Sequence, residues 1–332
     1  MKKQIVILDD WEQNFNHATN GQTSSQADWQ IVTSNAHVTV HHETLRGASL
    51  LAALKDADAI VLMRDRTPFK ADLIDQLPKL KYVVFTGTRN TQLDFEALAK
   101  RNIPVGCTAF GPSKENTCEI TWALILGALK QLETNAHLMR SGQWRESQGT
   151  KLMPILLGQR LGIIGLGEIG GRVAKVGLAF GMDVVCWSPN MTPERAAAKG
   201  VKSVSLDELL TTSKVVTLHI VPSAATKNFM NEQRISQLRS DAVLVNTSRA
   251  SLIDMPALEA ALSKGKGFAA LDVYDQEPVA ADHPIRKLPN VLLTPHLGFV
   301  CEPVFKNFDA GVAECLAAWV QDKPLVRTTT GA

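Results

Sequence analysis

The chain has 332 residues, of which 45% are apolar and 20% charged, with 35 Lys and Arg against 33 Asp and Glu. This length predicts two domains with separate cores, and the apolar content excludes a disordered chain. The balanced charge gives no sign of nucleic-acid or anionic-membrane binding. No apolar run approaches the roughly 20 residues that cross a membrane. The four consecutive apolar residues before Asp9 are too few for a signal peptide.

The cysteines and histidines indicate neither disulfides nor a metal. The five cysteines are odd in number and form no C-x-x-C pair. We therefore expect reduced thiols in a cytoplasmic protein. His41, His42 and Glu43 stand together, but no further cluster at ligand spacing accompanies them, so we expect no metal site.

In the first third of the chain, short β-branched runs alternate with helical stretches, which is typical of a parallel sheet covered by helices. The pattern predicts strands at residues 4–8, 59–63 and 82–86 and helices at 46–55, 70–77 and 94–100. A longer helix is predicted at 117–140, with Asn116 as N-cap and Glu119 completing a capping box. A helix of that length between two units is either a hinge or a dimer surface, and the sequence leaves both open.

The alternation resumes near residue 155. It predicts six strands, at residues 160–164, 184–187, 215–218, 242–246, 267–271 and 291–293. Six strands with crossover helices form one doubly wound dinucleotide-binding sheet. A last helix at 303–321 follows the sixth strand, and its return to the first unit would make the first domain discontinuous. The predicted fold class is α/β, with two doubly wound parallel sheets.

A glycine-rich turn follows the first strand of this second series. Residues 160–170 read RLGIIGLGEIG, so that an apolar strand runs into the spacing G-x-G-x-x-G. Gly165 permits a tight turn, Gly167 lets the backbone approach a pyrophosphate, and Gly170 lets the next helix lie close to the strand. The helix N-terminus attracts phosphate charge. With a strand before it and a helix after it, the motif predicts dinucleotide binding.

The residue that distinguishes NAD from NADP is not acidic here. NAD-binding sheets commonly carry a carboxylate at the end of the second strand, about 20 residues after the turn. In this chain Ser188 follows that strand, and Asp183 precedes it. Ser188, with Asn190, Thr192 and Arg195 near it, fits either cofactor, and the choice stays open.

Several candidate ligand contacts, most of them polar, follow the later strands, at the edge of the sheet where ligands bind. They are His219, Val221-Pro222 after the third strand, Thr247-Ser248-Arg249 after the fourth, Asp272 and then Glu277 after the fifth, and His296 after the sixth. Histidine moves a proton near neutral pH, and a carboxylate on its other nitrogen fixes the tautomer. An arginine fork binds a carboxylate and polarises a neighbouring carbonyl. Together these residues predict hydride exchange with a 2-hydroxy or 2-oxo acid.

The chain resembles the D-isomer-specific 2-hydroxyacid dehydrogenase family from about residue 45 to about residue 320. The matching segments are LGIIGLGEIGGRVA, VVTLHIVPSAAT, AVLVNTSRASLID, ALDVYDQEP and NVLLTPHLG. It is similar in particular to the phosphoglycerate dehydrogenase-like or hydroxypyruvate reductase-like branch. The resemblance implies a flavodoxin-like substrate domain from residues 1–109 and 299–332, around an inserted Rossmann domain at 110–298. It also implies an active site in the cleft between them and a homodimer.

The resemblance further implies roles for individual residues. Arg249 would bind substrate, Glu277 would orient His296, and His296 would be the acid–base residue. The backbone N–H groups of Gly87 and Thr88 would hold the substrate carboxylate, and Asp272 would contact the nicotinamide amide. The remaining expected cofactor contacts are Thr117, Gly165, Gly167, Glu168, Ile169, Gly170, Ser188, His219, Val221, Pro222, Thr247 and Ser248.

The substrate and the function both have alternatives. Arg64 and Arg89 would either hold a second anionic group, such as a phosphate, or form surface or domain-closing ion pairs. The first possibility corresponds to a D-3-phosphoglycerate dehydrogenase. A non-catalytic regulator that senses NAD(P) on the same fold is the third alternative, although a sensor needs no proton donor.

Overall fold

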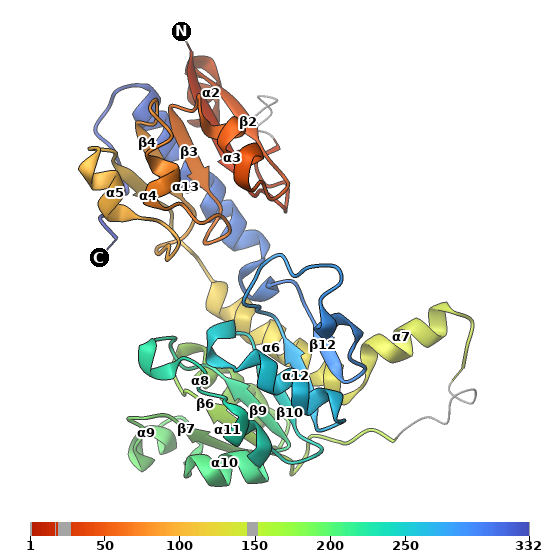
Figure 1. Ribbon diagram of the computed structural model, residues 1–332. Helices are drawn as coiled ribbons and strands as arrows, with labels where there is room; N and C mark the ends of the chain where they lie inside the picture. Colours follow the sequence, from red (N-terminus) through yellow and green to blue (C-terminus); the bar gives the residue numbers. More distant parts are fainter. Residues whose placement is uncertain (1, 17, 19–27, 145–151, 332) are drawn as a thin grey trace. The chain divides into compact units, whose positions relative to one another are not determined.

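The computed structural model describes residues 2–16, 18, 28–144 and 152–331 and divides into two compact units (Figure 1). Unit 1 comprises Met1–Pro112 and Cys301–Ala332, and unit 2 comprises Ser113–Val300. These boundaries lie close to the predicted domain limits of 109/110 and 298/299. The first unit is thus built from both ends of the chain.

Unit 1 contains a five-stranded sheet in which all neighbouring strands are parallel, in the order β2-β1-β3-β4-β5. The strands are β1 (Lys3–Leu8), β2 (Ala36–Val40), β3 (Ala59–Leu62), β4 (Tyr82–Phe85) and β5 (Val105–Cys107). This order is that of the flavodoxin-like fold, as predicted. The sequence pattern missed β2 and β5.

Helices cover both faces of this sheet. They are α2 (Asp28–Asn35), α3 (Gly47–Leu54), α4 (Ala71–Ile74), α5 (Phe95–Lys100) and α13 (Glu302–Val320). Alternate strand residues such as Val6 and Leu8 pack with α3, α4 and α5 in one core. Helix α13 packs on α2 and on the strands β4 and β5. Burial on both faces explains why the central strands β3 and β4 are continuously apolar rather than alternating.

Unit 2 contains a seven-stranded parallel sheet in the order β12-β11-β10-β9-β6-β7-β8. The strands are β6 (Arg160–Ile164), β7 (Asp183–Trp187), β8 (Lys202–Ser203), β9 (Val215–Leu218), β10 (Val243–Asn246), β11 (Phe268–Leu271) and β12 (Val291–Leu293). Six of them were predicted, and β8 is an additional short edge strand. The predicted doubly wound α/β fold is confirmed.

Two cores lie on the two faces of this sheet. One contains α6 (Ser113–Leu129) and α8 (Glu168–Ala179), and the other contains α10 (Leu206–Thr212), α11 (Glu232–Gln237) and α12 (Met255–Ser263). The short helix α9 (Pro193–Ala197) lies beside β8. Single 3-10 turns follow four strands: η2 (Ala224–Thr226), η3 (Ala250–Leu252), η4 (Pro284–Lys287) and η5 (Leu297–Phe299).

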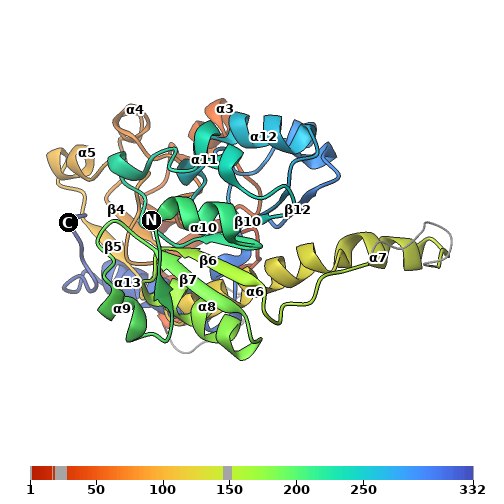
Figure 2. The same cartoon turned by 90° about the horizontal axis from the view of Figure 1, so that it is seen from below.

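The predicted long helix at 117–140 is wrong in two respects. It is two helices, α6 and α7 (Leu132–Arg140), because Gln131 adopts the left-handed conformation with φ 47°. Helix α6 also begins at Ser113, so Asn116 lies inside its first turn and is not its N-cap. Helix α7 has no buried residue and extends away from the sheet of unit 2 (Figure 2). Over the described ranges, none of the helices has the length and apolar character needed to cross a membrane.

Candidate active site

The glycine turn after β6 has the geometry of a dinucleotide-binding turn. Gly165 has φ 100°, and a Cβ there would lie 2.6 Å from the backbone of His219. A Cβ on Gly170 would collide with the carbonyl oxygen of Gly165, so only glycine lets α8 lie against the turn. At Gly167, by contrast, a Cβ would meet no atom within 4 Å. The backbone is therefore open to a ligand on that side.

Helix α8 starts directly at this open point, with Gly167 as its N-cap. Its first N–H groups and its dipole fit a pyrophosphate there. The Glu168 carboxylate is paired with Arg172 at 3.3 Å and lies 3.8 Å from Lys114, and Ile169 packs on the core. These two expected cofactor residues thus offer their backbone rather than their side chains, and the turn fits the dinucleotide.

The segment after β7 carries no acidic group next to the strand. Ser188 follows the strand, and the Arg195 guanidinium donates to the carbonyl of Asn190 at 2.6 Å. Asp183 is the first residue of β7, and its carboxylate pairs with Arg160 at 2.7 Å. Because Asp183 lies at the amino end of the strand, it is at the edge opposite the glycine turn. β7 therefore provides no carboxylate beside Ser188 that would repel the 2′-phosphate of NADP.

The side chain of His219, an expected cofactor contact, is hydrogen-bonded within its own strand segment. Its ring nitrogen Nε2 lies 2.9 Å from Thr217 Oγ1. Desolvation lowers the pKa of His219 to about 4, so the ring is neutral at pH 7. Its backbone packs on Gly165 instead. The neighbouring Val221 is 75% exposed and Pro222 is exposed, which leaves both accessible to a ligand.

The turn after β10 presents Arg249 and is shaped by Asn246, which sequence reasoning missed. Asn246 Oδ1 accepts from the Ser248 N–H at 3.0 Å, and its Nδ2 donates to the Arg249 carbonyl at 2.9 Å. An asparagine that closes a turn in this way replaces backbone hydrogen bonds. Thr247 is buried, with its hydroxyl 2.8 Å from that of Thr121 on α6. Its side chain is therefore hydrogen-bonded within the protein.

Glu277 and His296 form a hydrogen-bonded pair. His296 Nδ1 donates to Glu277 Oε2 at 2.7 Å, and the Tyr274 N–H donates to Glu277 Oε1 at 2.9 Å. The two side chains are 28% and 27% exposed. Burial raises the pKa of Glu277, but the hydrogen bond and charge of His296, the Tyr274 N–H and the charge of Arg249 together lower it below its usual range. The predicted pair is therefore assembled, with Arg249 in electrostatic reach and His296 Nε2 on the ring edge away from Glu277.

Asp272 holds the turn after β12. Its carboxylate accepts from Thr294 Oγ1 at 2.6 Å, the Leu297 N–H at 2.7 Å and the Gly298 N–H at 2.8 Å. Burial raises the pKa of Asp272 although these hydrogen bonds lower it. Thr117 also serves this turn, since its hydroxyl lies 2.7 Å from the Gly298 carbonyl. Both expected cofactor residues are thus engaged within the protein.

In unit 1, the loop after β4 departs from the expectation for Gly87. The Gly87 N–H donates to Thr108 Oγ1 at 2.8 Å, and Gly87 is buried. This amide is therefore already hydrogen-bonded within unit 1. Thr88 and Arg89, the next two residues, are exposed.

Arg64 folds back onto the same loop. Its Nη1 donates to the carbonyls of Thr86 at 3.2 Å and Arg89 at 3.0 Å, and its guanidinium lies over the ring of Phe110 at 4.5 Å. Asp65 lies 3.7 Å from Nη2. Arg64 thus fixes the loop from within unit 1.

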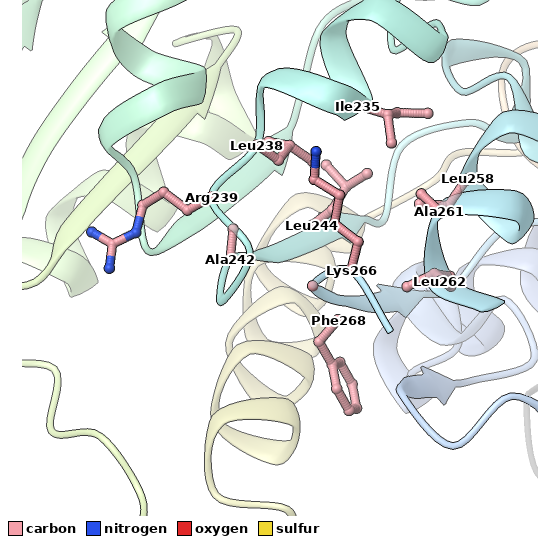
Figure 3. Close-up of a pocket in the computed structure, with 11 residues that line it drawn as sticks. Ile235, Leu238, Arg239, Ala242, Leu244, Leu258, Ala261, Leu262, Lys266 and Phe268 are labelled. Carbon is pink, nitrogen blue, oxygen red and sulfur yellow. The ribbon is translucent and has the colours of Figure 1, made fainter. Parts of the chain in front are cut away.

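A separate pocket lies away from these residues. A pocket at the opposite edge of the unit 2 sheet, where β10 and β11 begin, is apolar (Figure 3). Its apolar lining includes Ile235, Leu238, Leu244, Leu258, Leu262 and Phe268. Among the described parts of the chain, no group of His, Cys, Asp and Glu is arranged to hold a metal ion.

Comparisons with known proteins identify the family of the chain. Residues 122–298 match the family model for the NAD-binding domain of D-isomer specific 2-hydroxyacid dehydrogenases. The chain is 34% identical to a glyoxylate reductase of Aeropyrum pernix, over 83% of each chain. It is also 34% identical to a D-3-phosphoglycerate dehydrogenase of Methanocaldococcus jannaschii, over 80% of this chain but 50% of that enzyme.

A crystal structure of a phosphoglycerate oxidoreductase from Vibrio cholerae superimposes with a TM-score of 0.86 at 30% identity. The superposition covers 97% of this chain and 100% of that one. The chain therefore belongs to the D-isomer specific 2-hydroxyacid dehydrogenase family and is an NAD- or NADP-dependent oxidoreductase that acts on a CH–OH group.

Proposed function

We propose that the protein interconverts a 2-oxo acid and its D-2-hydroxy acid, with His296 as the acid–base residue. The observation that carries this proposal is the 2.7 Å hydrogen bond from His296 Nδ1 to Glu277. It fixes the tautomer and the orientation of the ring, so that Nε2 is left to exchange a proton with the substrate. A regulator that only senses the cofactor would not need this pair.

Each of the three residues has its own role in the proposed reaction. When bound, the nicotinamide ring exchanges a hydride with the substrate carbon. In the reducing direction, His296 Nε2 donates a proton to the substrate oxygen, and in the oxidising direction it takes that proton back. Glu277 keeps the imidazole oriented throughout. The Arg249 guanidinium binds the substrate carboxylate with two N–H groups and polarises the neighbouring carbonyl.

We propose a small 2-oxo acid without a second anionic group as the substrate. Arg64 supports this choice, because its guanidinium is bonded to the carbonyls of its own loop and stacks on Phe110. The exposed backbone at Thr88 and Arg89 replaces Gly87 as the candidate donor to the substrate carboxylate. Ser188, which lacks a carboxylate, is compatible with the 2′-phosphate of NADP as well as with NAD.

One assay tests these choices together. NADH and NADPH consumption is measured in parallel with glyoxylate, hydroxypyruvate, pyruvate and phosphohydroxypyruvate. We expect turnover of at least one unphosphorylated acid, with the D-hydroxy acid as product. Turnover of phosphohydroxypyruvate alone would instead identify a D-3-phosphoglycerate dehydrogenase. Tight NADH or NADPH binding without any turnover would favour the sensing regulator.

We also propose a homodimer in the cytoplasm. Exposed apolar side chains on α7 and on the segment that returns from it, such as Leu132, Met139, Leu152 and Ile155, support self-association. The five cysteines, all within described segments, are free thiols, as a reducing compartment requires. Sedimentation equilibrium distinguishes a dimer from a monomer directly.

A further inference from the structure

The backbone at His296 is held in an uncommon conformation. His296 has φ 57° and ψ 51°, in the left-handed region, and the 3-10 turn η5 begins at the next residue. A residue with a side chain stays there only where surrounding groups hold it. The groups that hold η5 therefore decide where the imidazole lies.

On the N–H side, η5 is held by one carboxylate. Asp272 accepts from the Leu297 and Gly298 N–H groups at 2.7 and 2.8 Å, which follow His296 in the sequence. It also accepts from the hydroxyl of Thr294, which precedes His296. The hydrogen bonds of Asp272 thus bracket His296 in the sequence.

On the carbonyl side, η5 is held by the first turn of α6. Asn116 Nδ2 donates to the carbonyls of Leu297 at 2.9 Å and Gly298 at 3.2 Å, and lies 3.5 Å from that of Val300. Thr117 Oγ1 lies 2.7 Å from the Gly298 carbonyl. Neither α6 residue is next to His296 in the sequence.

Gly298 of η5 lies close to the side chains of both Asp272 and Thr117. A Cβ on Gly298 would lie 3.2 Å from Asp272 Oδ2 and 3.5 Å from Thr117 Oγ1. The Gly298 backbone therefore has little room to shift toward Asp272 or Thr117.

We propose that Asn116 is a positioning residue for the acid–base histidine, and this inference rests on the proposed role of His296. The Asn116 amide supplies the N–H groups that two neighbouring carbonyls of η5 require. An aspartate of the same shape would present only acceptor oxygens to those carbonyls. Removing the amide frees the carbonyl side of η5, and the left-handed conformation of His296 is no longer enforced.

The consequence reaches the active site through Glu277. The hydrogen bond and charge of His296 lower the pKa of Glu277, whereas burial raises it. When His296 moves away, burial remains and the pKa of Glu277 rises. Since the ionised carboxylate is the form that orients His296, the acidic limb of the pH profile of kcat/KM then moves to higher pH.

The test compares Asn116→Asp and Asn116→Ala with a matched control. Asn290 donates through Nδ2 to the carbonyls of Leu262 and Gly267 at 3.1 and 3.0 Å, at the opposite edge of the sheet. Asn290→Asp therefore breaks the same kind of contact away from the site. The measurements are kcat, the pH profile of kcat/KM, the dissociation constant of NADH from fluorescence, and thermal unfolding.

We expect both Asn116 variants to lose roughly 10- to 100-fold in kcat, as a misplaced catalytic group does. Their acidic limbs move to higher pH, and NADH binding changes less than about threefold. Asn290→Asp keeps the wild-type profile even where it lowers the unfolding temperature. The neutral alanine variant shows that an added charge does not cause the shift.

Two results would overturn the inference. One is a wild-type profile and kcat in both Asn116 variants, and the other is an equal shift in Asn290→Asp. A His296→Gln variant measured alongside separates this failure from that of the proposed function. If His296→Gln is inactive while the Asn116 variants are normal, only the positioning role fails. If His296→Gln is fully active, the proposed function itself fails.

Discussion

Replacing Glu277 with glutamine isolates the contribution of its charge to the proposed proton transfer. The substitution keeps the shape of the side chain and removes the charge that accepts from His296 Nδ1 at 2.7 Å. A hydrogen bond to a charged partner contributes about 1.5–3 kcal/mol. Each 1.36 kcal/mol corresponds to a factor of ten in rate. Because both side chains are less than a third exposed, little of this energy is lost to solvent screening, and kcat should fall by roughly 10- to 150-fold.

The assay is steady-state turnover of the preferred 2-oxo acid at pH 7, with NADH affinity measured separately. Glu259 offers a matched control, since it lies 3.8 Å from His283 Nδ1 and is similarly buried but is remote from the site. Glu259→Gln should leave kcat unchanged. A Glu277→Gln enzyme within about threefold of wild type, or one that loses only NADH affinity, would refute the reasoning.

Three further changes test other parts of the account. Arg249→Lys should lower kcat/KM for the 2-oxo acid by roughly 10- to 150-fold, because one ammonium cannot replace a two-pronged guanidinium, and unchanged kinetics would place the substrate elsewhere. Ser188→Asp should lower kcat/KM for NADPH by about tenfold or more relative to NADH, since a carboxylate repels the 2′-phosphate; an unaltered ratio would show that Ser188 is not near that phosphate. Asp309→Leu removes the acceptor 2.8 Å from the buried Trp29 Nε1 and should reduce the free energy of unfolding in urea by about 1–3 kcal/mol, whereas an unchanged midpoint would contradict the importance of this bond.

The elements that the sequence predicted well are those with strong local signals. The strands β3 and β4 are continuously apolar because helices cover both faces of the sheet. The missed strands lack that signal. β2 is a partly exposed edge strand, β5 has three residues with a central glycine, and β8 has two residues. Their pairing is fixed by neighbouring strands rather than by their own composition.

In the site, too, some contacts could be predicted from the sequence and others could not. Glu277 and His296 were predicted to meet because the carboxyl ends of parallel strands share one edge, and the structure joins them. Asn116 was interpreted as a local helix cap, but its amide bonds to carbonyls about 180 residues away in the sequence. Gly87 was expected to offer its N–H to a substrate, yet Thr108 accepts it. Contacts of this kind depend on the folded arrangement and leave no pattern in the nearby sequence.

The role of His296 is tested most directly by a His296→Gln variant, assayed for turnover and for NADH and NADPH binding on the same preparation. We predict that kcat falls by roughly 10²–10⁴-fold while the cofactor binds with wild-type affinity. Turnover close to wild type at intact cofactor binding would contradict it.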